Sequence, residues 1–367
     1  MKTFKCNCDG QPTLFFESHI CNSCGRLVGI TDEFRQVQSF ELNKENGLYF
    51  LQSQSDTYYK KCKNFAEYDV CNGMVEANVS GADTANIEYC FACLFNNTIP
   101  NLAVAEHLPL WKKMETAKRR ALYTLKGLPV TLENIQQNST SGLVFNFCVD
   151  SDAKDHFVSA LPNQNKVMTG HDSGNITINL AEADDVAISR TRLEMGEQYR
   201  TLLGHFRHEL GHYYFDQLIA NDPAKSAACK QIFGDHEYSY EESLKRHYDQ
   251  GPPANWRQEF ISEYATMHPW EDWAETWAHY MHIIDTLETL ANYNITLEIN
   301  NKNLLNDDQV LVEPDQNSFT DLLRTWMEFS VILNSLNRSM GLQDAYPFVL
   351  SEPVREKLKF IHHAIYN

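Results

Sequence analysis

Cysteine placement is the feature that most constrains the fold of this chain. Eight of its ten cysteines lie within the first 93 residues, and only Cys148 and Cys229 lie beyond them. The chain has 367 residues, which is long enough for two domains. We therefore expect a cysteine-rich region over residues 1–98 and a second domain over residues 99–367, in which Cys148 and Cys229 are ordinary buried thiols.

The first cysteine cluster has the spacing of a zinc ribbon. It reads CNCDGQPTLFFESHICNSCG, with a C-x-C pair at Cys6 and Cys8 and a C-x-x-C pair at Cys21 and Cys24. The apolar segment 14–16 between the pairs is typical of a short strand. With each pair on a tight turn, the four thiolates can converge tetrahedrally on one zinc ion.

The second cysteine cluster is less regular. Only Cys90 and Cys93 have the C-x-x-C spacing of a ligand pair, whereas Cys62 and Cys71 lie apart. The pattern favours a second four-cysteine zinc site, and the alternative is that Cys62 and Cys71 are buried thiols. We thus expect one or two structural zinc ions here. A site closed by four thiolates has no open position for chemistry, so we expect this region to present substrate or to dock a protein partner.

Hydrophobic periodicity outlines the elements of the second domain. Residues 109–127 have the pattern of an amphipathic helix, and residues 142–149 and 175–181 have that of strands. A capping box at 191–194 (TRLE) opens a longer helix, which Asn-Asp-Pro ends near residue 220. Apolar residues recur on one face of this helix, while three histidines and a glutamate share another stripe.

The stretch HELGH at residues 208–212 matches H-E-x-x-H. Positions four apart on an α-helix project side by side, so His208 and His212 can bind one zinc ion. Glu209 would then lie beside the zinc-bound water and act as general base. The alternative for so short a motif is a solvated helical face with two surface histidines.

A third protein ligand is expected from a downstream helix that begins at Pro269. Tryptophans and aliphatic residues form one side of this helix, and Glu271 and Glu275 lie one turn apart on the other. One carboxylate can complete a two-histidine, one-glutamate set, and the other can hold a ligand imidazole through its second nitrogen. The third histidine that metzincins carry soon after the motif is absent after His212.

At this point the sequence resembles a family of bacterial zinc-binding metallopeptidases that carry an N-terminal zinc ribbon. The matching stretches are spread over most of the chain and read FKCNCDGQPTLFFESHICNSCGRLVG, CFACLFNNTIPNL, METAKRRALYTL, GNITINLAEADD, YRTLLGHFRHELGHYYFDQL and YATMHPWEDWAETWAHYMHIIDTLETL. The resemblance implies a zincin-like domain with one catalytic zinc ion. It implies less about the substrate.

The sequence is also distantly similar to the Mlc titration factor peptidases, zincins of the glutamate-ligand class. Their order of tyrosine-alanine, spacer, proline and a glutamate that opens E-x-x-A is matched by YATMHPWEDWAE. This similarity implies that Glu271 is the third ligand, that Glu275 supports a ligand imidazole, and that Tyr264 lies near the metal. A tyrosine there could donate a hydrogen bond to the oxyanion. Packing is the alternative role for Tyr264.

Two further expectations concern the surroundings of the motif. In zincins the strand before the active-site helix is often a sheet edge, and NITINLA stands in that place. If exposed, it would hold an extended peptide by strand addition. His205 and Arg207 receive no role from the pattern, and we expect His205 to support the site rather than to bind the metal.

Net charge limits the classes of partner. The formal charge is −18, from 31 basic and 49 acidic residues. This balance argues against nucleic-acid binding and against binding to anionic membranes, both of which need clustered Lys and Arg. The N-terminus has no apolar run of signal-peptide length, and no stretch approaches 18 consecutive apolar residues. We therefore expect a cytoplasmic protein.

These features together predict an α+β protein, with a zincin-like metallopeptidase domain behind a cysteine-rich zinc-ribbon region. The expected substrate is a peptide or a protein. One alternative is a non-catalytic zinc-ribbon adaptor whose HExxH domain binds metal for structure, with a closing fourth ligand such as His205 or His268. Another is a zinc hydrolase of non-peptide amides, which would use the same chemistry.

Overall fold

The computed structural model describes residues 1–31, 35–77, 87–150, 169–185, 188, 201–293, 295, 298–299, 302–303 and 319–366. The chain forms two compact units, Met1–Arg190 and Thr191–Asn367, which are described separately. Helices and strands are both present, which confirms the predicted α+β class. The expected domain boundary at residues 98 and 99 stays a prediction.

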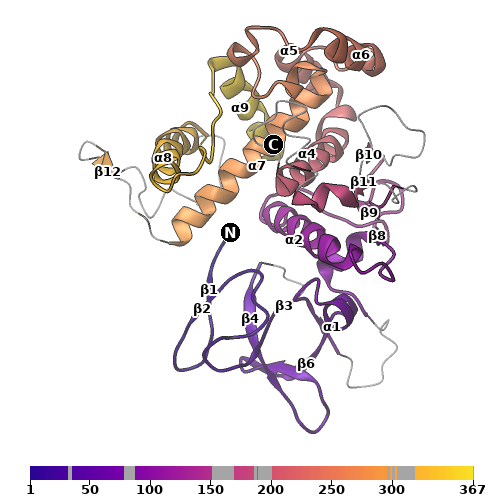
Figure 1. Ribbon diagram of the computed structural model, residues 1–367, viewed down its shortest axis with the longest axis vertical. Helices are drawn as coiled ribbons and strands as arrows, with labels where there is room; N and C mark the ends of the chain where they lie inside the picture. The colour runs from indigo at the N-terminus through magenta and orange to yellow at the C-terminus, as the bar shows by residue number, and fades with distance from the viewer. Residues whose placement is uncertain are drawn as a thin grey trace. The chain divides into compact units, whose positions relative to one another are not determined.

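Short antiparallel strands dominate the cysteine-rich part of the first unit (Figure 1). Strands β1 (Phe4–Lys5) and β2 (Thr13–Leu14) form a hairpin, and of the strand predicted over residues 14–16 only Leu14 lies in β2. A five-stranded sheet follows in the order β3-β4-β5-β6-β7. Its strands and the helix after β6 are β3 (Leu27–Ile30), β4 (Val37–Leu42), β5 (Tyr49–Leu51), β6 (Gln54–Lys61), α1 (Lys63–Tyr68) and β7 (Met74–Glu76).

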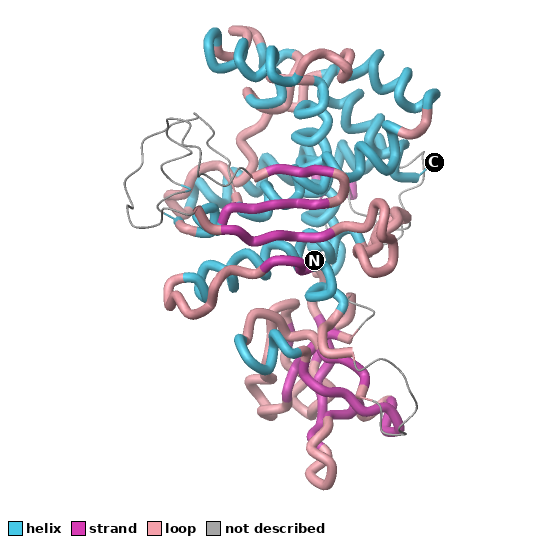
Figure 2. The backbone as a smooth tube through the Cα atoms, turned by 90° about the vertical axis from the view of Figure 1, so that its right-hand side faces the viewer, coloured by secondary structure: helices cyan, strands magenta, loops and turns pink. Residues whose placement is uncertain are grey.

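The rest of the first unit is a long helix and a four-stranded sheet. The predicted helix over 109–127 is confirmed as α2 (His107–Leu125), and the predicted strands are confirmed as β9 (Val144–Cys148) and β11 (Asn175–Asn179). Figure 2 shows the four strands side by side, in the order β10-β11-β9-β8. The remaining elements are η1 (Phe91–Phe95), β8 (Asn96–Thr98), β10 (Gly170–Asp172) and η2 (Leu180–Ala183).

The expectation that NITINLA is a sheet edge is wrong. Strand β11 pairs with β9 in parallel on one side and with β10 in antiparallel on the other, so its backbone is already hydrogen-bonded on both sides. Ser173 and Gly174 both have positive φ, 50° and 86°. This is the backbone of a tight two-residue turn, and it folds β10 back against β11. The outer position on this side of the sheet belongs to β10.

Hydrogen bonds hold helix α2 to the cysteine-rich part of its own unit. The buried Asn72, next to Cys71, donates from Nδ2 to the carbonyl oxygens of Phe16 at 2.8 Å and Ser18 at 2.9 Å. Arg119 of α2 donates to the side-chain oxygen of the same asparagine. A buried amide can satisfy all these partners only when the segments stay in register, so Asn72 fixes the second cysteine cluster relative to α2.

The second unit is mainly helical in the part that the structure describes. Helix α4 (Leu202–Phe215) continues as a π-helical turn, η3 (Asp216–Ala220), and α7 (Pro269–Asn292) is its main partner (Figure 1). The other elements are α5 (Pro223–Phe233), α6 (Tyr240–Gln250), η4 (Trp256–Gln258), η5 (Tyr264–Thr266), β12 (Glu298–Ile299), β13 (Lys302–Asn303), α8 (Phe319–Ser339) and α9 (Glu352–Tyr366).

The ends of α4 and α7 follow from local sequence. The predicted end of the HExxH helix near residue 220 is confirmed, whereas the predicted capping box at 191–194 lies outside the described residues. Thr201 caps α4, because its Oγ1 accepts a hydrogen bond from the backbone N–H of Gly204 at 2.9 Å. Pro269 opens α7 as predicted, and His268 caps it by accepting from the N–H of Trp270 at 3.1 Å.

Helices α4 and α7 approach closely at the glycine of HELGH. A Cβ on Gly211 would lie 2.9 Å from the Cα of Ala274, a separation that real Cβ atoms essentially never show. Trp273 donates from Nε1 to the carbonyl oxygen of Gly211 at 2.8 Å, and the rings of Tyr214 and Trp277 stack at 4.9 Å. The glycine therefore lets α7 bring its carboxylates up to the histidines of α4. Among the described residues, no helix is long and apolar enough to cross a membrane.

Candidate metal centres

The HExxH side chains of α4 are buried rather than solvated. His208 is 8% exposed, Glu209 4% and His212 3%. Burying three titratable groups on one stripe is unfavourable unless they have charged partners or a metal. The alternative of two surface histidines on a solvated face is therefore wrong.

Three ligand-type atoms converge between α4 and α7. The Nε2 of His208 lies 2.9 Å from the Oε2 of Glu271, and the Nε2 of His212 lies 3.2 Å from the same oxygen. The two imidazole nitrogens are 3.1 Å apart. Of the two carboxylates that the helical pattern offered, the structure thus brings Glu271 to both histidines.

The other nitrogen of His208 is held by the second glutamate. Its Nδ1 lies 2.6 Å from the Oε1 of Glu275, whose Oε2 accepts a hydrogen bond from Ser262 Oγ at 2.7 Å. Without a metal, burial lowers the pKa of His208, but Glu271 and Glu275 outweigh it and raise the pKa well above its usual value, so each ring nitrogen can direct a proton at one carboxylate. In neutral His208 with its Nδ1 proton directed at Glu275, the Nε2 lone pair faces Glu271 at 2.9 Å and can bind a cation between them.

The geometry of this group fits a metal ion. Nitrogen and oxygen ligands at about 2.0–2.2 Å from one zinc, at tetrahedral angles, are roughly 3.3–3.6 Å apart. The observed separations of 2.9, 3.1 and 3.2 Å need only a slight opening. Glu271 Oε2 is buried and faces both imidazole nitrogens, as expected of an atom that shares a metal ion with them. His208, His212 and Glu271 therefore form a two-histidine, one-glutamate group of metal-ligand type.

Glu209 lies on the same stripe and is oriented by a histidine. Its Oε1 is 3.1 Å from the Nε2 of His205, whereas its Oε2 is buried without a hydrogen-bond partner in the described part of the chain. Burial raises the pKa of this carboxyl, but His205 and the two HExxH histidines outweigh it and lower the pKa below its usual value. Glu209 is thus held as a carboxylate with one oxygen available.

Neither histidine proposed as a closing fourth ligand belongs to the group. His205 contacts Glu209, and His268 uses Nδ1 for the cap of α7 and Nε2 for the carbonyl oxygen of Tyr238 at 3.1 Å. Within the residues that the structure describes, the metal-type group consists of His208, His212 and Glu271 alone. Arg207 contacts Asp285 of α7 at 2.6 Å, which assigns it to the packing of the two helices.

Aromatic side chains surround the three ligands. The ring of Tyr264 lies 6.0 Å from that of His208, which places this predicted residue beside the centre. Trp270 covers the imidazole of His212 at 3.6 Å between ring centroids. Tyr240 donates from its hydroxyl to the Oε1 of Glu271 at 2.8 Å.

Sequence reasoning missed three of the residues around the ligands: Ser262, Tyr240 and Trp270. Ser262 and Tyr240 come from outside the two helices that carry the ligands. No spacing pattern links them to the motif. Trp270 could have been found, because it is adjacent to Glu271 at the start of α7.

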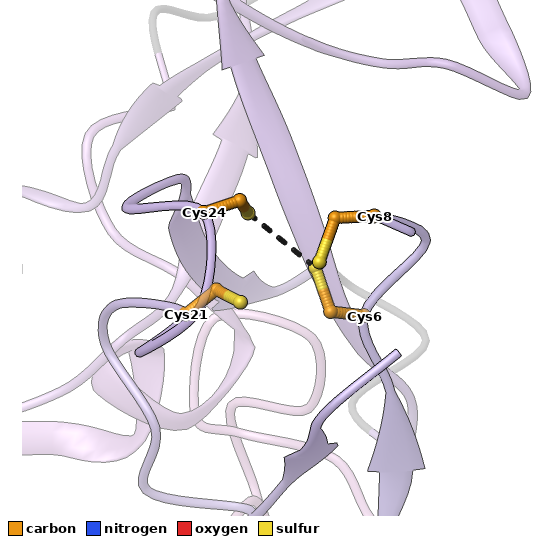
Figure 3. Close-up of side chains that lie close together, drawn as sticks. All are labelled: Cys6, Cys8, Cys21 and Cys24. Atoms are coloured by element: carbon orange, nitrogen blue, oxygen red, sulfur yellow. Dashed lines mark hydrogen bonds between the residues drawn. The ribbon is translucent and has the colours of Figure 1, made fainter. Parts of the chain in front are cut away.

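The first cysteine cluster has the geometry of a tetrathiolate site. Figure 3 shows Cys6 and Cys8 on one loop and Cys21 and Cys24 on another, with their sulfurs directed toward a common centre. The Sγ atoms of Cys6 and Cys24 are 3.8 Å apart. Four sulfurs at about 2.3 Å from one zinc stand roughly 3.8 Å apart, so the group fits this metal. Burial raises the pKa of Cys6, but hydrogen bonds, chiefly from Ser39, lower it to about 6, which favours the thiolate.

The second cysteine cluster also brings together all four of its members, although only one pair has ligand spacing. The Sγ of Cys71 lies 3.7 Å from that of Cys93 and 4.0 Å from that of Cys90. Cys62 belongs to the same group. Each of the four is at most 4% exposed. Four thiols packed this closely differ from scattered core cysteines, so the geometry favours a second metal site over the alternative of ordinary buried thiols.

Comparison with protein families accounts for nearly the whole chain. A family model described as "Putative zinc-binding metallo-peptidase" matches residues 107–364. A second model, described as a zinc-ribbon domain, matches residues 3–104. Zinc binding therefore has support from both families as well as from the three ligand groups.

Similar proteins occur in mycobacteria. Uncharacterized proteins of Mycobacterium bovis and of two strains of Mycobacterium tuberculosis are each 37% identical over 370 residues, which cover 100% of this chain and 95% of the relative. No solved structure matches the chain significantly. The likeness thus extends over both the cysteine-rich region and the HExxH domain.

Proposed function

Because this chain belongs to the family of zinc-binding metallo-peptidases with an N-terminal zinc ribbon, we propose that it hydrolyses peptide bonds at the centre between α4 and α7. The substrate would be a peptide or a protein. The single observation that carries the proposal is the convergence of His208, His212 and Glu271 beside the buried carboxylate of Glu209. A purely structural site would have no use for a buried carboxylate with an unpaired oxygen.

In the proposed centre His208, His212 and Glu271 hold one zinc ion. Zinc in such a site lowers the pKa of a bound water and polarises the carbonyl that is attacked. Glu275 keeps the Nδ1 proton of His208 in place, so that the Nε2 stays a ligand. Two histidines and one glutamate leave a fourth position open, which is the property that separates this group from the two cysteine groups.

Glu209 is the proposed general base and then acid. Its carboxylate takes the proton of the attacking water and delivers it to the nitrogen of the departing amine. The contact with His205 at 3.1 Å holds one oxygen, which leaves Oε2 for the proton. Tyr264, beside His208, is the proposed donor to the oxyanion of the tetrahedral intermediate.

The two cysteine groups are proposed to bind structural zinc, so a fully loaded chain would carry three ions. Each group ties together segments that have little core of their own. The second group anchors the turn next to Asn72, whose hydrogen bonds reach Phe16 and α2. A zinc-ribbon surface held in this way is suited to contact a protein partner, including a protein substrate.

Metal content and activity, measured on the same samples, test the proposal. Wild type, Glu209→Gln and His212→Ala are purified, their zinc per chain is determined, and each is incubated with a mixed peptide library. The proposal expects cleavage by wild type only. Glu209→Gln keeps all its zinc, whereas His212→Ala loses one ion per chain.

Two outcomes would overturn parts of the proposal. If His212→Ala keeps the wild-type zinc content, the metal belongs to the cysteines alone and the chain is a zinc-ribbon adaptor. If His212→Ala carries one zinc ion fewer than wild type but wild type cleaves no peptide, the centre binds metal without peptidase activity. Cleavage of small amide substrates in place of peptides would instead favour the amide hydrolase alternative.

A further inference from the structure

A tyrosine from a third helix contacts the ligand carboxylate. Tyr240 is the first residue of α6, a helix that Ser239 caps through a hydrogen bond from the N–H of Glu242 at 3.3 Å. The Tyr240 side chain reaches away from its own helix to α7, where its hydroxyl donates to Glu271 Oε1 at 2.8 Å. The other oxygen of Glu271 faces the two histidines.

We propose that Tyr240 is a positioning residue of the metal centre, which acts by holding Glu271 as a ligand through one oxygen only. A carboxylate can bind zinc through one oxygen or through both. A hydrogen bond from a phenol occupies Oε1 and fixes the rotation of the carboxylate, so that Oε2 alone is presented to the metal. The inference rests on the proposed zinc centre but not on its peptidase activity.

The hydrogen bond from Tyr240 restrains the rotation of Glu271 at the oxygen that the two histidines do not contact. The carboxylate is 2% exposed, so water contributes little to its orientation. Hydrogen bonds to an ionised acceptor are about twice as strong as neutral ones. His208 and His212 both contact Oε2, and Tyr240 is the side chain on Oε1.

Tyr240 is itself held by aromatic contacts at the start of α7. Its ring lies 6.0 Å from that of Trp270 and 5.5 Å from that of His268. Trp270 in turn covers His212 at 3.6 Å. These contacts use the ring and not the hydroxyl, so Tyr240→Phe removes the hydrogen bond and keeps the packing.

The experiment measures zinc affinity at this centre in the full-length protein. Tyr240→Phe is compared with wild type after removal of the labile metal, by competition with a chromophoric chelator while the cysteine sites remain loaded. We expect zinc to bind roughly 10–100-fold more weakly, the usual effect of losing a group that orients a ligand. Tyr238→Phe is the matched control, since Tyr238 is two residues away and 68% exposed, and it should bind zinc like wild type.

A cobalt spectrum and a double variant test the route of the effect. If Glu271 becomes a two-oxygen ligand in Tyr240→Phe, cobalt at this centre changes from four to five ligands and its visible absorption weakens. In a Glu271→Gln background, Tyr240→Phe should change zinc affinity little, because its effect passes through Glu271. The comparison of the two backgrounds also covers the case in which Tyr240→Phe lowers the stability of the fold, because a general loss of stability would weaken zinc binding in both backgrounds.

The inference is overturned if Tyr240→Phe keeps the wild-type zinc affinity and cobalt spectrum. It is equally overturned if the loss of affinity is the same in the Glu271→Gln background, because Tyr240 would then act elsewhere. Failure of the peptidase proposal has a different signature: wild type binds zinc tightly at this centre and cleaves no peptide. In that case the result for Tyr240→Phe still decides the inference.

Discussion

The Nδ1 of His208 and the Oε1 of Glu275 are 2.6 Å apart, one of the shortest contacts around the proposed centre. The pair joins α4 to α7, two helices that meet at Gly211. It determines which imidazole nitrogen carries the proton and therefore whether Nε2 can bind a metal. The chemistry of His208 thus depends on a residue 67 positions later in the chain.

We predict that Glu275→Gln weakens zinc binding at this centre by about 10–100-fold. An amide can donate its own hydrogen to Nδ1, which would leave the proton on Nε2 and remove the ligand lone pair. Competition titration with a chelator measures the change. Glu241→Gln, an exposed carboxylate on α6, is the control and should bind zinc as wild type does. Equal affinity in Glu275→Gln and wild type would contradict a role for Glu275 in orienting His208.

Gly211→Ala should destabilise the second unit. The added Cβ would meet the Cα of Ala274 at 2.9 Å and its carbonyl oxygen at 3.1 Å, and backbone atoms cannot move aside as a flexible side chain can. Overpacking of this kind costs about 1–3 kcal/mol of unfolding free energy. Gly170→Ala is the matched control, because its Cβ would meet nothing within 4 Å. Urea unfolding measures the stability of both variants. Equal unfolding midpoints for Gly211→Ala and Gly170→Ala would show that α4 and α7 can move apart at little cost in free energy.

Helical periodicity accounts for what the sequence predicted of the centre. Positions four apart on α4 and on α7 share a face, so the pairing of His208 with His212 and the turn that separates Glu271 from Glu275 could be inferred before any fold was known. Periodicity says nothing about a residue from a third element. Tyr240 reaches Glu271 from α6 only through tertiary packing, and no local pattern marks it.

Sheet topology was predicted less well than the helices. Strand β11 has the alternation of a half-buried strand, but alternation does not reveal how many neighbours a strand has. Its partner β10 is three residues long and is joined by a Ser-Gly turn, a weaker hairpin signal than Asn-Gly. In the cysteine region, spacing identified one ligand pair of the second cluster. The approach of Cys62 and Cys71 to that pair depends on the fold.

The two cysteine groups should differ in reactivity. Cys24 is exposed and Cys8 half-buried in the first group, whereas all members of the second are at most 4% exposed. A thiol reagent needs contact with the sulfur, so limited alkylation should modify Cys24 first and release one zinc before the second group reacts. Mass spectrometry of the labelled peptides and a zinc-binding dye follow the two events. The buried Cys229 serves as an internal control, and labelling of the second group before Cys24 would rule out this order.

The burial of His279 predicts that the folded protein loses stability in mild acid. It is 5% exposed on α7, its Nδ1 contacts the hydroxyl of Tyr346 at 3.0 Å, and the ring of Phe348 lies 4.3 Å from its own. Burial lowers the pKa of His279 to about 4, although Glu275 acts to raise it. Because this pKa is below the unfolded value of about 6.5, the unfolded chain binds the proton first. Stability is therefore complete above pH 6.5 and falls as the pH drops from there toward 4.

Between pH 7.5 and 5.0 this single group should remove about 2 kcal/mol of unfolding free energy, and His279→Gln should lack that part of the pH dependence. Urea titrations of wild type and variant at both pH values measure the difference, in which contributions from other groups cancel. His363→Gln, a half-buried histidine on α9, is the control and should follow wild type. If His279→Gln loses as much stability as wild type over this range, folding does not lower the pKa of His279, and acid acts on the protein through another group.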